Sequence, residues 1–350
     1  MPVAQSSRRR RARWSHRRVQ PTEAVPQPTR PTEAVQQLSP LRQAAVSARR
    51  AQLAPGVVLG DRYRIEGVIG RGGMSIVHAA YDPVLQRDVA IKVVDATRGV
   101  DGAGNPVETE GRLAAALCHP GLMTVLDAGT HRLEDGASLF YLVMERARLG
   151  DLRTLLQARP LTWAATARLG TDLALALAHL HDAGYLHRDV KPANVLITGV
   201  DMDGRIRARL TDFGTSSQPS RAADGTAVGT AAYLSPEQVG GHPATARSDV
   251  YALGLVLIEC STGVVAFPGP IQVSMSERVR RDPALPDGIP AAAEEALRAM
   301  TNRVPEGRPS AAEAADLLRQ ARDAAVSRAP GRHAAQAQAQ ADPVGAVRPR

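Results

Sequence analysis

The stretch that decides the fold of this 350-residue chain is "YLHRDVKPANVLI", residues 185–197. Its centre holds Asp189, Lys191 and Asn194, with apolar residues on both sides. Lys191 is one of only two lysines in the sequence, and the other is Lys92 in "VAIKVV" (89–94). The guanidinium group of Arg is wide and planar, whereas the ammonium group of Lys is a compact point charge. The two lysines therefore predict two sites that are too narrow for a guanidinium group.

The composition is that of a globular protein with an aliphatic core. Hydrophobic residues make up 44% of the chain, charged residues 22% and aromatic residues only 3%. The 350 residues suffice for one large domain or two smaller ones.

The two cysteines, Cys118 and Cys260, have no metal-binding spacing, and we expect reduced thiols. No apolar run approaches the roughly 18–20 residues of a membrane span, and no apolar segment follows Arg8–Arg11 as an export signal requires. We therefore expect a cytoplasmic protein.

The net charge of +8 comes from the first 54 residues, which contain eleven arginines and two acids, Glu23 and Glu33. The rest of the chain is close to neutral, which argues against nucleic-acid binding by a generally basic domain. Residues 1–54 are rich in Arg, Pro and Gln without a hydrophobic period, and we predict a disordered tail. The alternative for its segment "RRRRARWSHRR" (8–18) is binding to nucleic acid or anionic lipid. "PTEAV" occurs twice in this tail, as low-complexity drift or as a docking or phosphorylation motif.

Hydrophobic periodicity predicts an α+β chain with a small β-rich lobe before a larger helical lobe. Alternating apolar residues in 56–95 predict three antiparallel strands, and two more are expected at 122–130 and 139–145. We predict helices around Val107–Leu117 and, from their 3.6-residue period, at 161–184, 249–261, 290–301 and 310–321. The expected domain covers 55–321, with an N-lobe at 55–144, a hinge at 145–150, a C-lobe at 151–321 and a flexible tail at 322–350.

Further motifs flank the two lysines in a fixed order. "GRGGMSIV" (70–77) is a Gly-rich turn whose backbone N–H groups can approach phosphates. "LTDFG" (210–214) and "YLSPEQ" (233–238) follow "HRDVKPAN". Together, over about residues 56–321, the chain resembles the eukaryotic-like (Hanks-type) serine/threonine protein kinases of bacteria, which implies the two-lobed protein kinase fold.

Three details depart from the family pattern. Ser75 stands where a third glycine is usual, and "SPE" replaces the commoner "APE". Asn194 and Asp212 are eighteen positions apart, with "DMDG" (201–204) between them. We interpret this insertion as a lengthened hairpin with an Asp-Gly turn and not as a fragment of a calcium-binding loop.

The resemblance implies a catalytic set. Lys92 would contact the α- and β-phosphates of ATP and pair with a glutamate of the next helix, Glu110, with Glu108 as the alternative. Asp189 would accept the proton of the substrate hydroxyl, and Lys191 would contact the transferring phosphate. The metal ligands would be Asn194 and Asp212, holding Mg²⁺, with Mn²⁺ as the alternative ion.

The resemblance also implies nucleotide-binding and regulatory residues. The nucleotide-binding set is Gly70, Gly72, Gly73, Ser75, Val77, Ala90, Lys92, Met144, Glu145, Ala147 and Leu196. Met144 would be the gatekeeper, before hinge residues whose backbone meets adenine. The matching motifs also predict that Asp249 anchors a buried helix and that Arg308 pairs with Glu237. Arg188, before Asp189, suggests control by phosphorylation of the loop between "DFG" and "SPE", at Thr226 or Thr230.

These residues predict a kinase that transfers the γ-phosphate of ATP to Ser or Thr of proteins, and to itself. The expected partners are protein substrates and a second copy of the chain for phosphorylation between copies. One alternative is a pseudokinase-like scaffold that binds nucleotide or partners without catalysis. The other is a small-molecule kinase of related fold, a class that usually lacks the Gly-rich loop and the "GT…SPE" segment.

Overall fold

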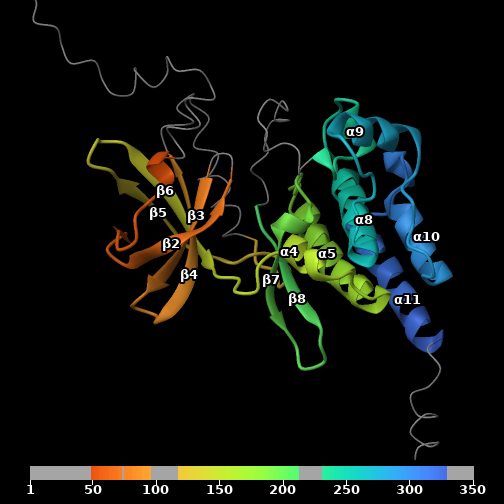
Figure 1. Ribbon diagram of the computed structural model, residues 1–350, viewed down its shortest axis with the longest axis horizontal. Helices are drawn as coiled ribbons and strands as arrows, with labels where there is room; N and C mark the ends of the chain where they lie inside the picture. Colours follow the sequence, from red (N-terminus) through yellow and green to blue (C-terminus); the bar gives the residue numbers. More distant parts are fainter. Residues whose placement is uncertain (1–48, 73–74, 96–116, 213–230, 329–350) are drawn as a thin grey trace, which may run out of the picture. The chain divides into compact units, whose positions relative to one another are not determined.

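The computed structural model describes residues 49–72, 75–95, 117–212 and 231–328. Along the chain, an antiparallel sheet precedes a set of helices (Figure 1). The predicted α+β fold, β-rich first and helical second, is confirmed. No helix in these four ranges combines the length and the hydropathy needed to cross a bilayer.

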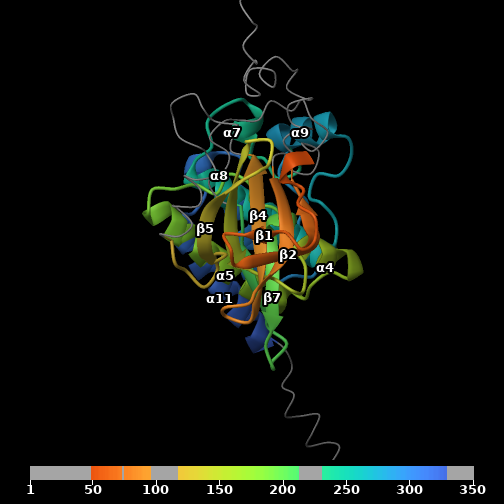
Figure 2. The same cartoon turned by 90° about the vertical axis from the view of Figure 1, so that its left-hand side faces the viewer.

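Six strands form one antiparallel sheet in the order β1-β2-β3-β4-β6-β5, with β5 at one edge and β2 towards the other (Figure 2). They are β1 (Val58–Leu59), β2 (Tyr63–Arg71), β3 (Ser75–Asp82), β4 (Arg87–Asp95), β5 (Val125–Arg132) and β6 (Ser138–Glu145). Every residue of β4 from Val89 to Asp95 is buried, including the charged Lys92 and Asp95, and the other five are apolar, as expected for an inner strand. The strands predicted in 56–95, 122–130 and 139–145 are therefore present.

The core of this sheet includes a segment that precedes the first strand. Ala51 and Leu53 are buried in the same cluster as Ile91. The backbone N–H of Leu53 donates to Nε2 of the buried His78 at 3.2 Å. The described structure thus begins at Arg49, ahead of the predicted start of the folded domain at 55.

A separate two-stranded hairpin is formed by β7 (Val195–Val200) and β8 (Ile206–Leu210). Asp201 N donates to Arg205 O, and Gly204 N donates to Asp201 O, both at 2.8 Å. Gly204 has a φ of +73°, a conformation that glycine adopts without steric cost. The lengthened hairpin with an Asp-Gly turn, predicted from "DMDG", is confirmed.

The helical part packs around α8, which is buried along most of its length. Its elements are α4 (Leu152–Ala158), α5 (Trp163–Asp182), α7 (Pro236–Val239), α8 (Ala246–Thr262), α9 (Ile271–Arg280), α10 (Ala291–Met300) and α11 (Ala311–Arg328), with 3₁₀ turns η1 (Pro192–Asn194) and η2 (Pro305–Gly307). α11 packs along α5 (Figure 1). A Cβ on Gly170 of α5 would lie 2.7 Å from a methyl group of Leu257 in α8, so glycine at this position allows the two helices to approach closely.

The predicted helices at 161–184, 249–261, 290–301 and 310–321 correspond to α5, α8, α10 and α11. Of the helix predicted at Val107–Leu117, only Leu117 lies within the described residues. α11 continues through Arg328, past the predicted domain end at 321. α4 and α9 were not predicted. The inner face of α9 carries the polar residues Ser274 and Arg278, which interrupt the apolar periodicity that reveals a helix.

Candidate active site

The central strand β4 brings four predicted nucleotide-binding residues to one face of the sheet. Lys92 lies opposite Val77 of β3 and Leu142 of β6, and Ala90 lies opposite Met144. Residues two apart on a strand point to the same face, and directly opposite residues share a face. Val77, Ala90, Lys92 and Met144 therefore lie together, with the one cation among apolar side chains.

Lys92 forms an ion pair with Asp212, 120 residues further along the chain, with 2.9 Å between Nζ and Oδ1. Lys92 is only 5% exposed. Asp212 has a φ of +61°, a left-handed conformation that is uncommon for a residue other than glycine. Burial by itself would raise the pKa of Asp212, but the Lys92 ammonium lowers it below its ordinary value. Asp212 is therefore a carboxylate at neutral pH.

The end of β8 positions Asp212 beside Asn194. Leu210 N donates to Gly121 O at 2.8 Å, which ties the strand to the loop before β5. Thr211 N donates to Asn194 O at 3.0 Å, which ties the following residue to the turn η1. The two predicted metal ligands thus lie on adjoining, mutually bonded pieces of backbone.

Asp189, Lys191 and Asn194 form one hydrogen-bonded cluster. Lys191 Nζ lies 2.7 Å from Asp189 Oδ2. Asn194 Nδ2 donates to the same carboxylate oxygen and to the backbone carbonyl of Asp189, both at 2.9 Å. The side chains of Asp189 and Lys191 are about one fifth exposed, so the cluster is ordered by its neighbours but open to an incoming molecule.

The backbone of this cluster is held in a strained shape by Asp249. Arg188 has a φ of +67°, which costs of order 1–3 kcal/mol unless the surroundings stabilise it. Arg188 N donates to Asp249 Oδ1 at 2.8 Å, and His187 N donates to Oδ2 at 2.9 Å. Nε2 of His181 lies 2.8 Å from the same Oδ2. Asp249, which was predicted to anchor the buried helix that became α8, therefore also supports the loop that presents Asp189 directly.

The Gly-rich turn joins β2 to β3. Gly70 pairs with Val77 across the two strands, and Gly72 N donates to Ser75 O at 2.8 Å. A Cβ on Gly72 would lie 3.1 Å from Ser75 Oγ, a contact tighter than side chains normally make. Gly73 lies outside the described residues.

The predicted hinge begins at the end of β6 and is clamped to β8. Arg209 Nη1 lies 2.6 Å from Glu145 Oε1 and donates to Thr124 Oγ1 at 2.8 Å. Leu196 pairs with Arg209 across the hairpin, and Ala147 lies two residues beyond β6. Burial raises the pKa of Glu145, and the Arg209 charge opposes that effect. The hinge residues thus lie close to Leu196, the residue predicted for the opposite side of the adenine.

Glu237 and Arg308 form a bidentate, buried ion pair. The two guanidinium nitrogens Nη1 and Nη2 each lie 2.8 Å from a carboxylate oxygen of Glu237. Ser248 Oγ donates to the same carboxylate at 2.6 Å. Burial by itself would raise the pKa of Glu237, but Arg308 and Ser248 lower it to about 2. The predicted pairing is confirmed, and it anchors the segment "SPE" against α8 and η2.

Residues 63–318 match the family model described as the protein kinase domain. The chain belongs to the protein kinase family. This kinase domain resembles bacterial serine/threonine kinases in particular. A probable serine/threonine-protein kinase of Corynebacterium efficiens is 39% identical over 293 residues, which is 79% of this chain and 44% of the relative.

Other bacterial relatives that are named serine/threonine-protein kinases are similarly close in sequence. The serine/threonine-protein kinase PknB of Mycobacterium tuberculosis is 39% identical over 278 residues, 75% of this chain and 43% of the relative. PknB of Mycolicibacterium smegmatis is 40% identical over 239 residues, 65% of this chain and 37% of the relative. The chain thus spans less than half the length of these curated relatives.

The described contacts bring Lys92 to Asp212, and Asp189 to Lys191 and Asn194. The described residues include Gly70, Gly72 and Ser75 of the Gly-rich turn, the shared face of β3, β4 and β6, and the Asp189 cluster. Glu110, its alternative Glu108, Thr226 and Thr230 lie outside the described residues, as Gly73 does. Sequence reasoning missed Arg209 and His181, which act on the hinge and on Asp249. Neither residue belongs to a sequence motif that predicts this site, so only the contacts in the structure reveal their roles.

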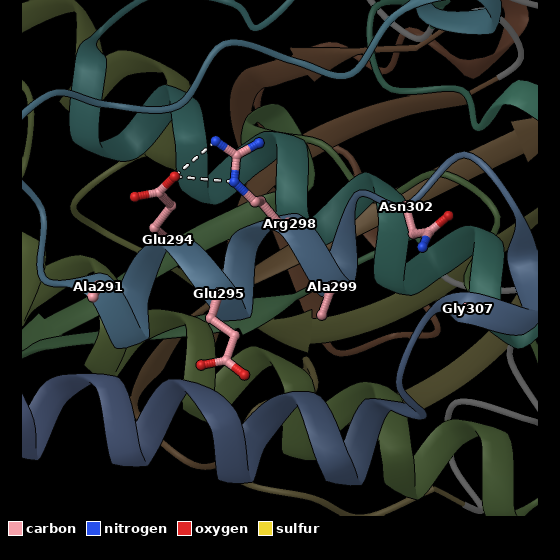
Figure 3. Close-up of a pocket in the computed structure, with 7 residues that line it drawn as sticks. All are labelled: Ala291, Glu294, Glu295, Arg298, Ala299, Asn302 and Gly307. Atoms are coloured by element: carbon pink, nitrogen blue, oxygen red, sulfur yellow. Dashed lines mark hydrogen bonds and ion pairs between the residues drawn. The ribbon is translucent and has the colours of Figure 1, made fainter.

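A surface hollow on the kinase domain lies away from these motifs (Figure 3). It is lined by Ala291, Glu294, Glu295, Arg298, Ala299, Asn302 and Gly307. Its one marked interaction is the exposed pair between Glu294 and Arg298, one turn apart on α10. Of the predicted catalytic and nucleotide-binding residues that the structure describes, none lines it, so the hollow adds nothing to the described part of the candidate active site. Within the described ranges, no group of three or more His, Cys, Asp or Glu side chains forms a ready-made metal site.

Proposed function

We propose that this chain is a serine/threonine protein kinase that transfers the γ-phosphate of ATP to protein hydroxyls, including its own. The observation that carries the proposal is the meeting of Lys92 and Asp212 at 2.9 Å. These residues belong to different motifs, far apart in sequence, and each has a separate task in phosphoryl transfer. The relatives are named serine/threonine-protein kinases, which supports Ser and Thr as acceptors.

ATP would lie between the sheet and the hairpin. Lys92 would contact its α- and β-phosphates, and the turn at Gly70 and Gly72 would lend backbone N–H groups to the phosphates. The apolar face with Val77, Ala90 and Met144 suits the flat, weakly polar adenine ring. Glu110 would pair with Lys92 in the active arrangement.

The residues present fit a magnesium ion. Both hydrogen bonds from Asn194 to Asp189 use Nδ2, so Oδ1 of Asn194 is the atom that would bind a cation. The Asp212 carboxylate would supply the second ligand, and such hard oxygen ligands suit Mg²⁺ or Mn²⁺. When bound, the ion would neutralise charge on the phosphates of ATP.

Asp189 would orient the substrate hydroxyl and accept its proton. Its contacts with Lys191 and Asn194 both use Oδ2, so Oδ1 is the oxygen that would face the hydroxyl. The hydroxyl oxygen forms a bond to the γ-phosphorus while the bond to the β-phosphate oxygen breaks, and ADP leaves. Lys191, 2.7 Å from Asp189, would stabilise the charge on the transferring group, so the protein contributes positioning and charge stabilisation.

Two further features complete the proposal. Autophosphorylation would occur at Thr226 or Thr230, between two copies of the chain, and the new phosphate would pair with Arg188.

The reaction would occur in the cytoplasm. Cys118 and Cys260 are both unpaired, which agrees with a reducing compartment.

The test is transfer of labelled γ-phosphate from ATP and Mg²⁺ by the purified chain, with the sites mapped by mass spectrometry. We expect the wild type to label itself and a generic Ser/Thr substrate, and Asp189→Asn to abolish labelling. Asp172→Asn, at a carboxylate that pairs with Arg205 outside the motifs, is the matched control and should remain active. If the wild type binds ATP but labels neither itself nor the substrate, the scaffold alternative replaces the kinase.

A further inference from the structure

The segment of residues 231–234, which directly precedes "SPE", is held by a single arginine of helix α9. Arg278 Nη1 donates to the backbone carbonyls of Ala231 and Leu234, both at 2.7 Å. Its Nη2 donates to the carbonyl of Ala232 at 2.8 Å and to Ser274 Oγ at 3.0 Å. One side chain therefore bonds three carbonyls of a four-residue segment.

This arginine is fully buried, at 0% exposure. All four oxygens that it bonds are uncharged, and removing a cation from water is costly unless its hydrogen bonds are well made. Its guanidinium lies over the ring of Phe267, 5.4 Å from the centroid, a favourable cation–π geometry. The planar fork suits this task because two nitrogens reach three carbonyls at once, which a lysine ammonium cannot do in the same geometry.

A second helix holds the same segment from another direction. Tyr233, between the bonded carbonyls, donates its hydroxyl to Glu259 Oε2 of α8 at 2.5 Å. Burial raises the pKa of Tyr233 and of Glu259. The tyrosine therefore keeps its proton and remains the donor. The backbone of the segment is thus fixed by α9 and its central side chain by α8.

The held segment adjoins the catalytic aspartate. Tyr233 and Leu234 line a narrow cavity together with Arg188, Asp189 and Gln238. A protein substrate must place its hydroxyl at Asp189, so the chain around that hydroxyl has to pass near this segment. The shape of residues 231–234 therefore bears on how a substrate can approach.

We propose that Arg278 is a positioning residue for the protein substrate. By fixing the carbonyls of Ala231, Ala232 and Leu234, it holds the 231–234 segment in the shape that a Ser- or Thr-containing polypeptide meets beside Asp189. This inference rests on the proposed kinase function. Arg278 itself, being buried, acts only through the segment and does not touch the substrate.

The test compares Arg278→Lys with Arg281→Lys in steady-state phosphorylation of a generic Ser/Thr peptide. Arg281 lies over the same Phe267 ring, at 5.1 Å, but it is exposed and pairs with Glu277 on the surface. We expect Arg278→Lys to raise the KM for the peptide about tenfold or more. The Kd for an ATP analogue should stay at the wild-type value. Arg281→Lys should match the wild type in both.

The possible results separate the positioning role from the kinase activity on which it rests. A wild type without any transfer activity overturns the kinase proposal itself. An active wild type with an unchanged peptide KM in Arg278→Lys overturns the positioning role. A Kd for the ATP analogue that changes in step with the peptide KM also overturns it, because a purely structural defect affects both.

A milder variant keeps the inference testable if Arg278→Lys does not fold. Thermal unfolding identifies that case. Ser274→Ala removes one of the four hydrogen bonds of Arg278 and leaves the arginine in place. We expect its peptide KM to rise about two- to fivefold with unchanged nucleotide binding. An unchanged KM in this variant contradicts the proposal.

Discussion

The two lysines of this kinase domain and two arginines that are buried among its described residues, Arg278 and Arg308, have different tasks in neighbouring regions. In the region where we propose that the phosphates of ATP bind, called here the phosphate region, Lys92 and Lys191 each bring an ammonium to a carboxylate, at 2.9 and 2.7 Å. In the region of "SPE", Arg308 bonds both oxygens of Glu237 and the carbonyls of Arg247, Asn302 and Arg303. Arg278 similarly bonds three carbonyls and a hydroxyl.

The difference teaches where each cation is useful. A fork that bonds four or five oxygens at once fixes backbone permanently, which suits a region that must keep one shape. A compact ammonium on a flexible stem can leave its carboxylate and approach a phosphate, which suits a region that must accept a ligand. This chain, which otherwise uses arginine, keeps its two lysines in the region that we propose must accept a ligand.

The largest expected effect comes from Lys92→Arg, which keeps the charge and changes only its shape. We expect phosphotransfer to fall about 100- to 1,000-fold, as when a preorganised charge contact to the reacting group is lost. The measurement is the initial rate of labelling at saturating peptide. Arg132→Lys, an exposed change on β5, is the control. Full activity of Lys92→Arg would show that a fork fits the phosphate region after all.

The converse exchange, Arg308→Lys, should mainly affect stability. A lysine could keep one contact with Glu237 and would leave the carbonyls of Asn302, Arg247 and Arg303 without their donor. We expect the free energy of unfolding in urea to fall by about 3 kcal/mol. Arg303→Lys, at an exposed pair with Asp282, should change it by less than about 0.5 kcal/mol. Equal effects of the two variants would contradict the comparison.

Lowering the pH tests the same ion pair without changing the arginine. The pKa of Glu237 is about 2 in the folded protein against an ordinary value of 4.5. Its stabilising contribution is therefore complete above about pH 5 and is lost as the pH falls towards 2. Between pH 7 and pH 3 this single group should cost about 2 kcal/mol of unfolding free energy. Urea unfolding across that range should show a correspondingly shallower pH dependence in Glu237→Gln, and identical slopes would refute the assignment.

The smallest effect is expected at an arginine whose fork is exposed. Arg298 bonds Glu294 one turn away on α10, with about half of each side chain in solvent (Figure 3). Pairs of this kind contribute about 0.3–0.5 kcal/mol, and salt screens them. Arg298→Lys should therefore leave the melting temperature almost unchanged. If Arg298→Lys lowered the stability of the fold as much as Arg308→Lys, burial would not be the reason that the guanidinium groups of Arg278 and Arg308 stabilise the protein.

Much of the fold follows from local periodicity, and the failure to predict helix α9 has a local cause. The strands of the sheet and the helices α5, α8, α10 and α11 repeat apolar residues at the spacing of their own geometry. Helix α9 was not predicted because its buried face carries the polar residues Ser274 and Arg278. Polar residues on the inner face remove the signal that burial normally leaves in a sequence.

The candidate site likewise has one part that the sequence predicts and another that only the tertiary structure reveals. Asp189, Lys191 and Asn194 lie within one short motif, so their spacing alone places them on one loop, and the rarity of lysine in the sequence singles out Lys92 and Lys191. Only the tertiary structure decided that Lys92 meets Asp212 across 120 residues and that Arg278 holds residues 231–234. The physical reason is that Arg278 bonds backbone carbonyls. Every residue has such a carbonyl, so the bonded partner leaves no mark in the sequence, and only the fold selects which carbonyls come within reach.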